Sequence, residues 1–484
     1  MSTGSPGLDL VLSGGLERGG VVVLAGAPGT GKTILAQQMC FANATPGHKA
    51  IYYTTVSEPH TKLVRHLEPF SFFDPAALGV TVEHIHLGDF LRPSADGADG
   101  ADGADGLAPM VSEIVRKTLE EEPAVVAIDS TKMLRDFANE RELRNALYDL
   151  TGRVADTGSV LLMLGEYTPE ELESGIEFSL ADAIIQLEYQ NREPVDRRSL
   201  RVTKVRGTSQ RPGRHTFQIG PDGVEVYPRI ETLLPHPMEA VSGRARTGVP
   251  GLDDLMDGGP KAGEATLVTG PSGVGKTVFA LRWVAAALEQ GARCIYVTFQ
   301  DTPDELIAMA STFGWGLGKA RAAGMLTVLY VPMGNLDLDV LASAIRAELE
   351  AQPVARVAID SLAELIFAVR EAERFPAFLR SLIGLIRAPG ASSLVTSETP
   401  PHGLTDNSLA PLMFLFHNVI DLRYIENGSR IDRAISVLKM RNSRHEMTLS
   451  SYTIGEHGIT LGETLEGVSG RLGWSVLTNR SLTG

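Results

Sequence analysis

The sequence has few cysteines and no long apolar run. Its 484 residues include only two cysteines, Cys40 and Cys294, which are too few for a disulfide framework, so we expect both to be buried apolar side chains. No stretch approaches the apolar length of a membrane span, and the N-terminal residues lack the basic and apolar segments of a targeting signal. These absences predict a cytoplasmic protein with no membrane partner.

Basic charge is also scarce. The chain has 44 lysines and arginines against 59 aspartates and glutamates, which gives a net charge of −15. Because nucleic-acid backbones bind to basic surfaces, this balance argues against a nucleic-acid partner, although it allows a local basic patch. A chain of this length is too long for one hydrophobic core, so we expect two or three domains.

One octet with the pattern G-x-x-x-x-G-K-[ST] occurs twice. This pattern is the phosphate-binding loop, in which glycines let backbone N–H groups face the phosphates, the lysine adds a positive charge and the last hydroxyl binds Mg²⁺. Each copy follows an apolar strand pattern and precedes an apolar helical pattern. The predicted nucleotide-binding residues are Gly26, Ala27, Pro28, Gly29, Thr30, Gly31, Lys32 and Thr33, and then Gly270, Pro271, Ser272, Gly273, Val274, Gly275, Lys276 and Thr277.

The two octets belong to an internal duplication. Residues 3–9 recur as residues 247–253, with the same offset of 244 residues that separates Gly26 from Gly270. A constant offset over several matching segments indicates two tandem copies of one structural unit. Apolar strand patterns alternate with helical patterns in both copies, so each copy is predicted to be an α/β domain.

The duplication also predicts the domain boundaries. We expect one domain over residues 1–235, a second over 239–462 and a C-terminal tail over 463–484, with a proline-bearing linker between the domains. The first copy alone contains four Ala-Asp-Gly repeats, residues 95–106. This tract has nothing apolar to bury, so it is predicted to be a disordered acidic insert.

Each copy places an aspartate at the end of a later apolar strand. Asp129 and Asp360 hold these matching positions. A carboxylate at the end of a strand beside a phosphate-binding loop is the Walker B element, which holds Mg²⁺, usually through water. The predicted metal ligands are therefore Thr33, Asp129, Thr277 and Asp360.

Further acidic residues follow two other predicted strands. Glu58 and Asp301 come just past the strand after the first long helix, where a carboxylate suits a general base for attacking water and equally suits the start of a helix. Glu166 and Glu398 follow a later strand, where either a γ-phosphate sensor or a solvated loop acid fits. The predicted catalytic residues are Glu58, Asp301, Lys32 and Lys276.

Two cations end a further strand in each copy. Lys204 and Arg206 match Lys439 and Arg441. A Lys-x-Arg pair on a strand projects both cations from one face, and cations at a nucleotide site stabilise the charge that develops during phosphoryl transfer. An edge strand with solvated charges is the alternative, but the recurrence of the pair favours a function in nucleotide binding.

Together these segments resemble the KaiC family of the RecA-type ATPases over nearly the whole chain. The resemblance rests on both phosphate-binding loops, on the openings at residues 3–9 and 247–253, and on residues 204–209, 297–303, 359–361 and 433–441. It implies two tandem RecA-like P-loop ATPase domains, each a mostly parallel sheet flanked by helices, with ATP and Mg²⁺ as ligands. It also implies a homohexamer with nucleotide at the subunit interfaces.

Further implications of the resemblance concern the cation pairs and the partner. Lys204, Arg206, Lys439 and Arg441 are expected to reach the γ-phosphate held by an adjacent subunit. A protein signalling partner is expected, because nothing in the sequence suggests a pocket for a second substrate. On this basis the leading hypothesis is a hexameric regulatory switch with slow ATP hydrolysis in one or both rings.

The chain departs from the family at the acids past the second strand. The family carries two consecutive glutamates there, whereas this chain has Gln300 and Asp301 in the second copy, and Glu58 falls one place late in the first. Because a misplacement of about 1 Å can lower a rate about 100-fold, we expect slow hydrolysis. Restoring Gln300→Glu together with Asp301→Glu is then expected to raise turnover.

Two alternatives remain open at this point. The family's Ser-Thr autophosphorylation pair falls at Met413 and Phe414, which have no hydroxyl, so a serine/threonine autokinase would need other hydroxyls such as Thr405 or Ser408. A RecA- or helicase-like DNA-dependent ATPase shares the same core, and only the basic residues 211–215 favour it. The acidic net charge counts against this second alternative.

Overall fold

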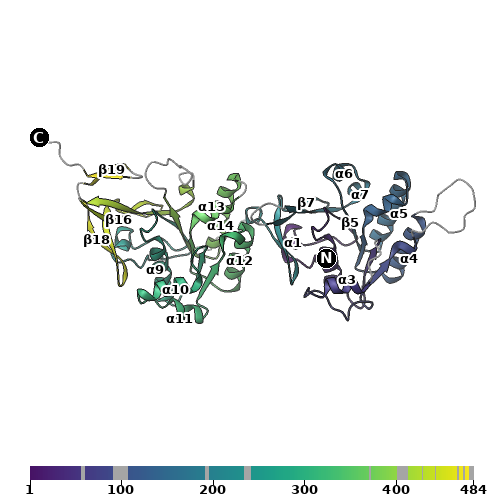
Figure 1. The fold of residues 1–484 in the computed structure, drawn as a ribbon, viewed down its shortest axis with the longest axis horizontal. Coiled ribbons are helices and arrows are strands. Elements are labelled where there is room, and N and C mark those ends of the chain that lie inside the picture. Colours follow the sequence, from purple (N-terminus) through teal and green to yellow (C-terminus); the bar gives the residue numbers. More distant parts are fainter. Residues whose placement is uncertain are drawn as a thin grey trace, which may run out of the picture. The chain divides into compact units, whose positions relative to one another are not determined.

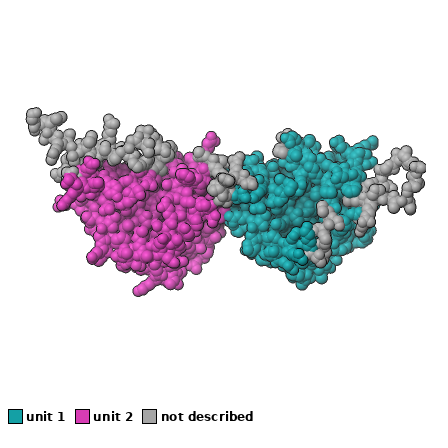
Figure 2. Space-filling view, viewed as in Figure 1, with its two compact units in different colours: residues 1–233 teal, residues 234–484 magenta. Residues whose placement is uncertain are grey.

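The chain forms two compact units, Met1–Leu233 and Leu234–Gly484 (Figure 2). The computed structural model describes residues 1–55, 60–90, 107–190, 196–233, 241–369, 372–399, 412–427, 429–441, 443–465, 468–471 and 475–478. Glu58, the predicted insert 95–106, Thr405 and Ser408 lie outside the described residues.

Unit 1 contains a nine-stranded sheet with the order β3-β2-β4-β5-β1-β6-β7-β8-β9. The first six strands in this order are parallel and the last three are added antiparallel. The strands are β1 (Val21–Gly26), β2 (Ala50–Thr54), β3 (Val82–His86), β4 (Val125–Asp129), β5 (Val160–Gly165), β6 (Ala183–Gln190), β7 (Arg197–Val205), β8 (His215–Gly220) and β9 (Gly223–Tyr227).

Helices cover both faces of this sheet, because its central strand is apolar on both sides. All six residues of β1 are buried. Val22 and Leu24 pack on the face covered by α2, whereas Val21 and Val23 pack on the face covered by α4 and α5. The helices are α1 (Pro6–Val11), α2 (Lys32–Asn43), α3 (His60–Leu67), α4 (Ala108–Glu121), α5 (Glu140–Asp156), α6 (Pro169–Ser174) and α7 (Ile176–Leu180).

Unit 2 repeats this topology, with the sheet order β12-β11-β13-β14-β10-β15-β16-β17-β18. The strands are β10 (Ala265–Gly270), β11 (Cys294–Thr298), β12 (Leu326–Tyr330), β13 (Arg356–Asp360), β14 (Ser392–Glu398), β15 (Asn418–Asn427), β16 (Arg430–Met440), β17 (Leu449–Gly455) and β18 (Gly458–Thr464). Two further strands, β19 (Val468–Arg471) and β20 (Ser475–Thr478), pair with each other. The predicted α/β fold class is confirmed for both units.

The helices of unit 2 again flank the sheet (Figure 1). Most of α9 is buried, and its Phe279 and Trp283 form part of the core with β10, β11 and β13. The helices are α8 (Leu252–Leu255), α9 (Lys276–Leu288), α10 (Pro303–Thr312), α11 (Leu317–Ala322), α12 (Leu338–Ala351), α13 (Leu362–Ala368) and α14 (Phe375–Arg387).

Two expectations about burial and membranes are tested by these elements. Cys40 and Cys294 are both buried free thiols, as predicted. Across the described ranges, no helix combines the length and the apolar character that a bilayer crossing needs.

Candidate functional site

The phosphate-binding loop of unit 1 connects the central strand β1 to α2. The loop turns into the helix at Gly31, which has a left-handed φ of 105° and serves as the N-cap of α2. A side chain at this position would be strained, so glycine is required for the tight turn. Gly275 repeats this geometry before α9 in unit 2, with φ 110°. The N-terminus of each long helix therefore opens directly onto its loop.

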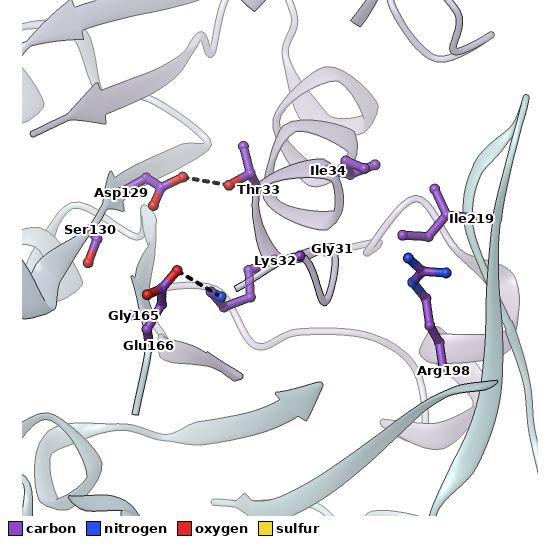
Figure 3. Close-up of a pocket in the computed structure, with 11 residues that line it drawn as sticks. Gly31, Lys32, Thr33, Ile34, Asp129, Ser130, Gly165, Glu166, Arg198 and Ile219 are labelled. Carbon is purple, nitrogen blue, oxygen red and sulfur yellow. Dashed lines mark hydrogen bonds and ion pairs between the residues drawn. The ribbon is translucent and has the colours of Figure 1, made fainter. Parts of the chain in front are cut away.

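Lys32 is folded back onto its own loop. Its Nζ donates to the carbonyl oxygens of Gly26 and Ala27, both at 2.9 Å, and the residue is only 8% exposed. Glu166 at the end of β5 approaches the same Nζ at 4.0 Å (Figure 3). Burial lowers the pKa of Lys32, while the charges of Glu166 and Asp129 act in the opposite direction. The ammonium is thus held at the loop by carbonyl and carboxylate oxygens.

Thr33 and Asp129 are brought together from 96 residues apart in the chain. Thr33 Oγ1 donates to Asp129 Oδ2 at 2.8 Å, and Tyr52 in β2 donates its hydroxyl to the same oxygen at 2.6 Å. Asp129 is the last residue of β4, and β4 is separated from β1 by β5 alone. Parallel strands that end at one edge of a sheet bring the carboxylate and the hydroxyl together, and the predicted role of these two residues as metal ligands stays a prediction.

A cavity of about 480 Å³ opens over this arrangement. In Figure 3, Asp129 and Glu166 lie on one side of Lys32, and Arg198 and Ile219 lie on the other side. The lining residues are Gly29, Gly31, Lys32, Thr33, Ile34, Asp129, Ser130, Gly165, Glu166, Arg198 and Ile219. The phosphate-binding loop of unit 1 therefore borders a cavity that is lined by both cationic and anionic side chains.

Arg198 was not predicted from the sequence. It lies in β7, and its guanidinium stands over the ring of Tyr189 at 4.8 Å. Arg433 in β16 has the same relation to Tyr424, at 5.9 Å. Each arginine precedes the lysine of its Lys-x-Arg pair by six residues, so this recurrence was the signal in the sequence that could have identified it.

In unit 2 the lysine has the same contacts, but the threonine that donates to the aspartate comes from a strand and not from the helix after the loop. Lys276 Nζ donates to the carbonyl oxygens of Gly270 at 3.0 Å and Pro271 at 2.9 Å. Asp360 accepts hydrogen bonds from Tyr296 at 3.0 Å and from Thr396 in β14. Thr277 is the second residue of α9. Burial lowers the pKa of Lys276, and the charges of Glu398, Asp360 and Glu364 oppose this shift.

The sequence predicts a catalytic acid just past β11, and the three residues there have three different environments. Thr302, not Asp301, is the N-cap of α10, and it forms a capping box with Glu305. Burial and the nearby charge of Asp360 raise the pKa of Asp301. Gln300 donates its amide to Glu364, a residue in α13 that the sequence reasoning did not identify. The signal for Glu364 was weak, since it is a lone glutamate in an apolar helix.

The Lys-x-Arg pairs lie away from the loops of their own units. Lys204 pairs with Ile184 across β7 and β6, and Ile184 lies beside Val23, the third residue of β1, whereas the loop follows the end of β1 at Gly26. Three residue steps along β1, from Val23 to Gly26, separate these levels, about 10 Å at the usual rise per residue. Lys204 Nζ instead donates to the carbonyl of Phe178 at 3.0 Å and lies within 3.4 Å of that of Ser179.

Arg206 and both cations of the pair in unit 2 also donate to backbone carbonyls. Arg206 contacts the carbonyl of Ser179 and the carboxylate of Asp182. Lys439 donates to the carbonyls of Met413 and Phe416, and Arg441 to that of Phe414. In both units the described contacts of the pair are therefore with groups outside its own phosphate-binding loop.

These features define the class of protein. A phosphate-binding loop after the central strand of a mostly parallel sheet, with an aspartate at the end of the next strand but one, makes each unit a RecA-like P-loop ATPase domain. The family model described as "ATPase: KaiC" matches residues 1–231 and 245–466. The chain therefore belongs to the KaiC family of ATPases.

Individual relatives match the chain almost from end to end. The circadian clock oscillator protein KaiC of Parathermosynechococcus lividus is 26% identical over 473 residues, which cover 96% of this chain and 86% of that protein. The circadian clock protein KaiC3 of Synechocystis sp. is 25% identical over 488 residues, covering 98% of this chain and 93% of the relative. Both loops of the chain thus fall within the regions of similarity.

Proposed function

We propose that this protein is a KaiC-like ATPase that binds and slowly hydrolyses ATP and acts as a homohexameric regulatory switch. The observation that carries the ATPase proposal is the convergence of Lys32, Thr33 and Asp129 on one cavity in unit 1. In unit 2, Lys276 has the same loop contacts and lies within the electrostatic influence of Asp360. Membership of the family supports ATP hydrolysis in general terms.

The oxygen ligands of unit 1 fit a magnesium ion. Thr33 Oγ1 and Asp129 Oδ2 lie 2.8 Å apart, and both are hard oxygen donors of the kind that Mg²⁺ takes together with water and phosphate oxygens. Thr277 and Asp360 offer the same two donors in unit 2. When bound, the ion supplies positive charge that offsets the charge on the phosphate oxygens.

The protein's own groups supply binding and orientation. The backbone N–H groups of each loop and the N-terminus of α2 or α9 face the phosphates. Lys32 and Lys276, now held by loop carbonyls, exchange these contacts for phosphate oxygens on nucleotide binding. In this proposal Asp301, whose pKa is raised by burial and by the charge of Asp360, takes the proton of the attacking water in unit 2.

The hexamer is supported by the position of the Lys-x-Arg pairs. Lys204 and Lys439 lie level with the third residues of the central strands, and their ammonium groups bind backbone carbonyls away from the loops, so a pair that acts at a nucleotide acts on the nucleotide of a second subunit. A ring of identical subunits satisfies this requirement at every interface. The switch then acts by changing the ring surface offered to a protein partner as ATP is turned over.

The decisive test follows the γ-phosphate. Purified protein is incubated with γ-labelled ATP and Mg²⁺, and the label is measured in free phosphate and on the protein. Label in free phosphate alone is the expected result, since Met413 and Phe414 replace the hydroxyl pair. Label on the protein would instead establish an autokinase, and turnover that rises with DNA and falls steeply with salt would establish a DNA-dependent ATPase.

A further inference from the structure

Glu364 is a buried carboxylate beside the candidate site of unit 2. It lies in the first turn of α13, four residues after Asp360, and is 8% exposed. One of its oxygens accepts from Gln300 Nε2 and the other from Ser361 Oγ, both at 2.5 Å. A buried carboxylate is costly unless its lone pairs are satisfied, so both donors are needed to keep it in place.

The pair of Gln300 and Glu364 has no counterpart in the described part of unit 1. The position that matches Glu364, counted from Asp129, is Met133, which is 38% exposed in the short segment Thr131–Asp136. The pair is therefore not a requirement of the fold. It is a feature of unit 2, at a position where unit 1 has Met133.

The neighbouring groups place this pair at the nucleotide end of the sheet. Gln300 follows β11 by two residues, and Thr298 at the end of β11 pairs in register with Asp360 at the end of β13. The charge of Glu364 also acts on Lys276 of the loop. Gln300 itself is exposed, so the side of its amide that faces away from Glu364 is open.

The carboxylate determines how the amide of Gln300 is oriented. A carboxylate accepts hydrogen bonds and repels a carbonyl oxygen, so the NH₂ group must face Glu364. Gln300 Oε1 is then directed to the open side as an acceptor. A glutamine held in this way can orient an attacking water, as glutamines do in other P-loop enzymes.

We propose that Glu364 is the positioning residue of the unit 2 ATPase, and that it acts by holding Gln300 so that Gln300 Oε1 accepts a hydrogen bond from the attacking water. This inference rests on the proposed ATPase function. The water oxygen forms a bond to the γ-phosphorus, and the bond from that phosphorus to the oxygen bridging the β-phosphate breaks. The water proton passes to Asp301 and then to solvent, and the bridging oxygen leaves with ADP.

The pair changes the outcome expected for a glutamate at position 300. Gln300→Glu would set two carboxylates at hydrogen-bonding distance, and one of them would then have to hold a proton. The substitution alone should therefore lower turnover in unit 2. The exchanged pair, Gln300→Glu with Glu364→Gln, keeps one carboxylate and one amide, and should recover it.

The test uses the full chain carrying Lys32→Ala, so that unit 2 alone turns over ATP. Glu364→Ala and Gln300→Ala are each expected to lower kcat at least about tenfold with KM for ATP changed less than about threefold, because positioning fails while binding persists. Glu350→Ala removes an exposed carboxylate of α12 and is the matched control, expected to leave kcat unchanged. Because Gln300 is exposed, its alanine variant reports on the proposal even if Glu364→Ala does not fold.

Two negative results are distinguishable. If the Lys32→Ala chain releases no more phosphate than a chain with both Lys32→Ala and Lys276→Ala, the ATPase proposed for unit 2 is absent and the inference falls with it. If the Lys32→Ala chain is active but Gln300→Ala retains kcat within twofold, only the positioning role is overturned. Failure of the exchanged pair to recover turnover above Gln300→Glu would also overturn it.

Discussion

The hydroxyl of Tyr52 lies 2.6 Å from Oδ2 of Asp129, the aspartate that also accepts from Thr33. Tyr296 holds the same relation to Asp360 in unit 2, at 3.0 Å. Both tyrosines are buried, and burial together with the neighbouring aspartate raises their pKa well above the usual range. Each phenol therefore stays protonated and acts as a fixed donor to the proposed magnesium ligand.

Removing the tyrosine hydroxyl should leave the carboxylate of the aspartate with one hydrogen bond fewer to hold its position. Tyr52→Phe is expected to destabilise unit 1 by about 1–2 kcal/mol, because a buried hydrogen bond to a charged group is lost. It should also raise the Mg²⁺ concentration for half-maximal turnover severalfold in a Lys276→Ala background. Thermal unfolding and a magnesium titration measure the two effects, and Tyr148→Phe, at an exposed site on α5, is the control. An unchanged magnesium requirement would contradict the role assigned to Tyr52.

The two lysines separate the contributions of the units. Lys32→Ala and Lys276→Ala should each abolish turnover in one unit, because the ammonium at each loop is lost. Turnover that survives Lys32→Ala belongs to unit 2 and turnover that survives Lys276→Ala belongs to unit 1. Steady-state phosphate release and filter binding of ATP measure hydrolysis and binding separately. Full activity in the double variant would contradict both assignments.

The Lys-x-Arg pair of unit 1 can be tested by mixing subunits. In a Lys276→Ala background, Lys32→Ala chains and chains with Lys204→Ala and Arg206→Ala should each be inactive alone. If the pair acts on the neighbouring subunit, random mixing in a ring restores about a quarter of the sites, because each restored site needs one chain of each kind in a fixed order. Phosphate release after co-refolding measures this recovery.

The mixing experiment needs a control for stability. Lys204 is bonded to two backbone carbonyls, so the variant chain is compared with the parent chain by thermal unfolding. Mixed chains that remain inactive while both variants are folded and hexameric would contradict action between subunits.

His417 predicts a loss of stability of unit 2 in mild acid. Its Nδ1 accepts from the backbone N–H of Ala265 at 3.2 Å, and Arg387 lies 3.0 Å from Nε2. Burial, reinforced by the charges of Arg387, Arg441 and Lys439, lowers the pKa of His417 to about 4. The unfolded chain binds this proton near pH 6.5, so the stabilising contribution is complete above pH 6.5 and declines as the pH falls toward 4.

The measurement is denaturant unfolding between pH 7 and pH 4. We expect the free energy of unfolding to fall by on the order of 2 kcal/mol more in the parent chain than in His417→Gln, which removes the titrating group. Equal slopes for both chains would show that other groups control the acid response.

The sequence predicted the chemical elements of the site because each is a local pattern. The glycines of the loops, the apolar strand before them and the aspartate that ends a later strand are read within a few residues of one another. The α/β fold class followed from the alternation of strand and helix patterns, and the duplication from the constant offset. The position of Lys32 at its loop and that of Asp129 beside Thr33 could be expected from local patterns and strand order alone.

Only the tertiary structure decided which distant residues meet these elements. Gln300 and Glu364 are 64 residues apart, and they touch because β11 and β13 are neighbours and α13 turns back after β13. Arg198 reaches the cavity of unit 1 because β7 joins the sheet antiparallel beside β6. The same antiparallel return places Lys204 level with the third residue of β1, where its ammonium binds the carbonyl of Phe178 instead of reaching its own loop. Strand order and direction fix these contacts, and no local pattern in the chain encodes them.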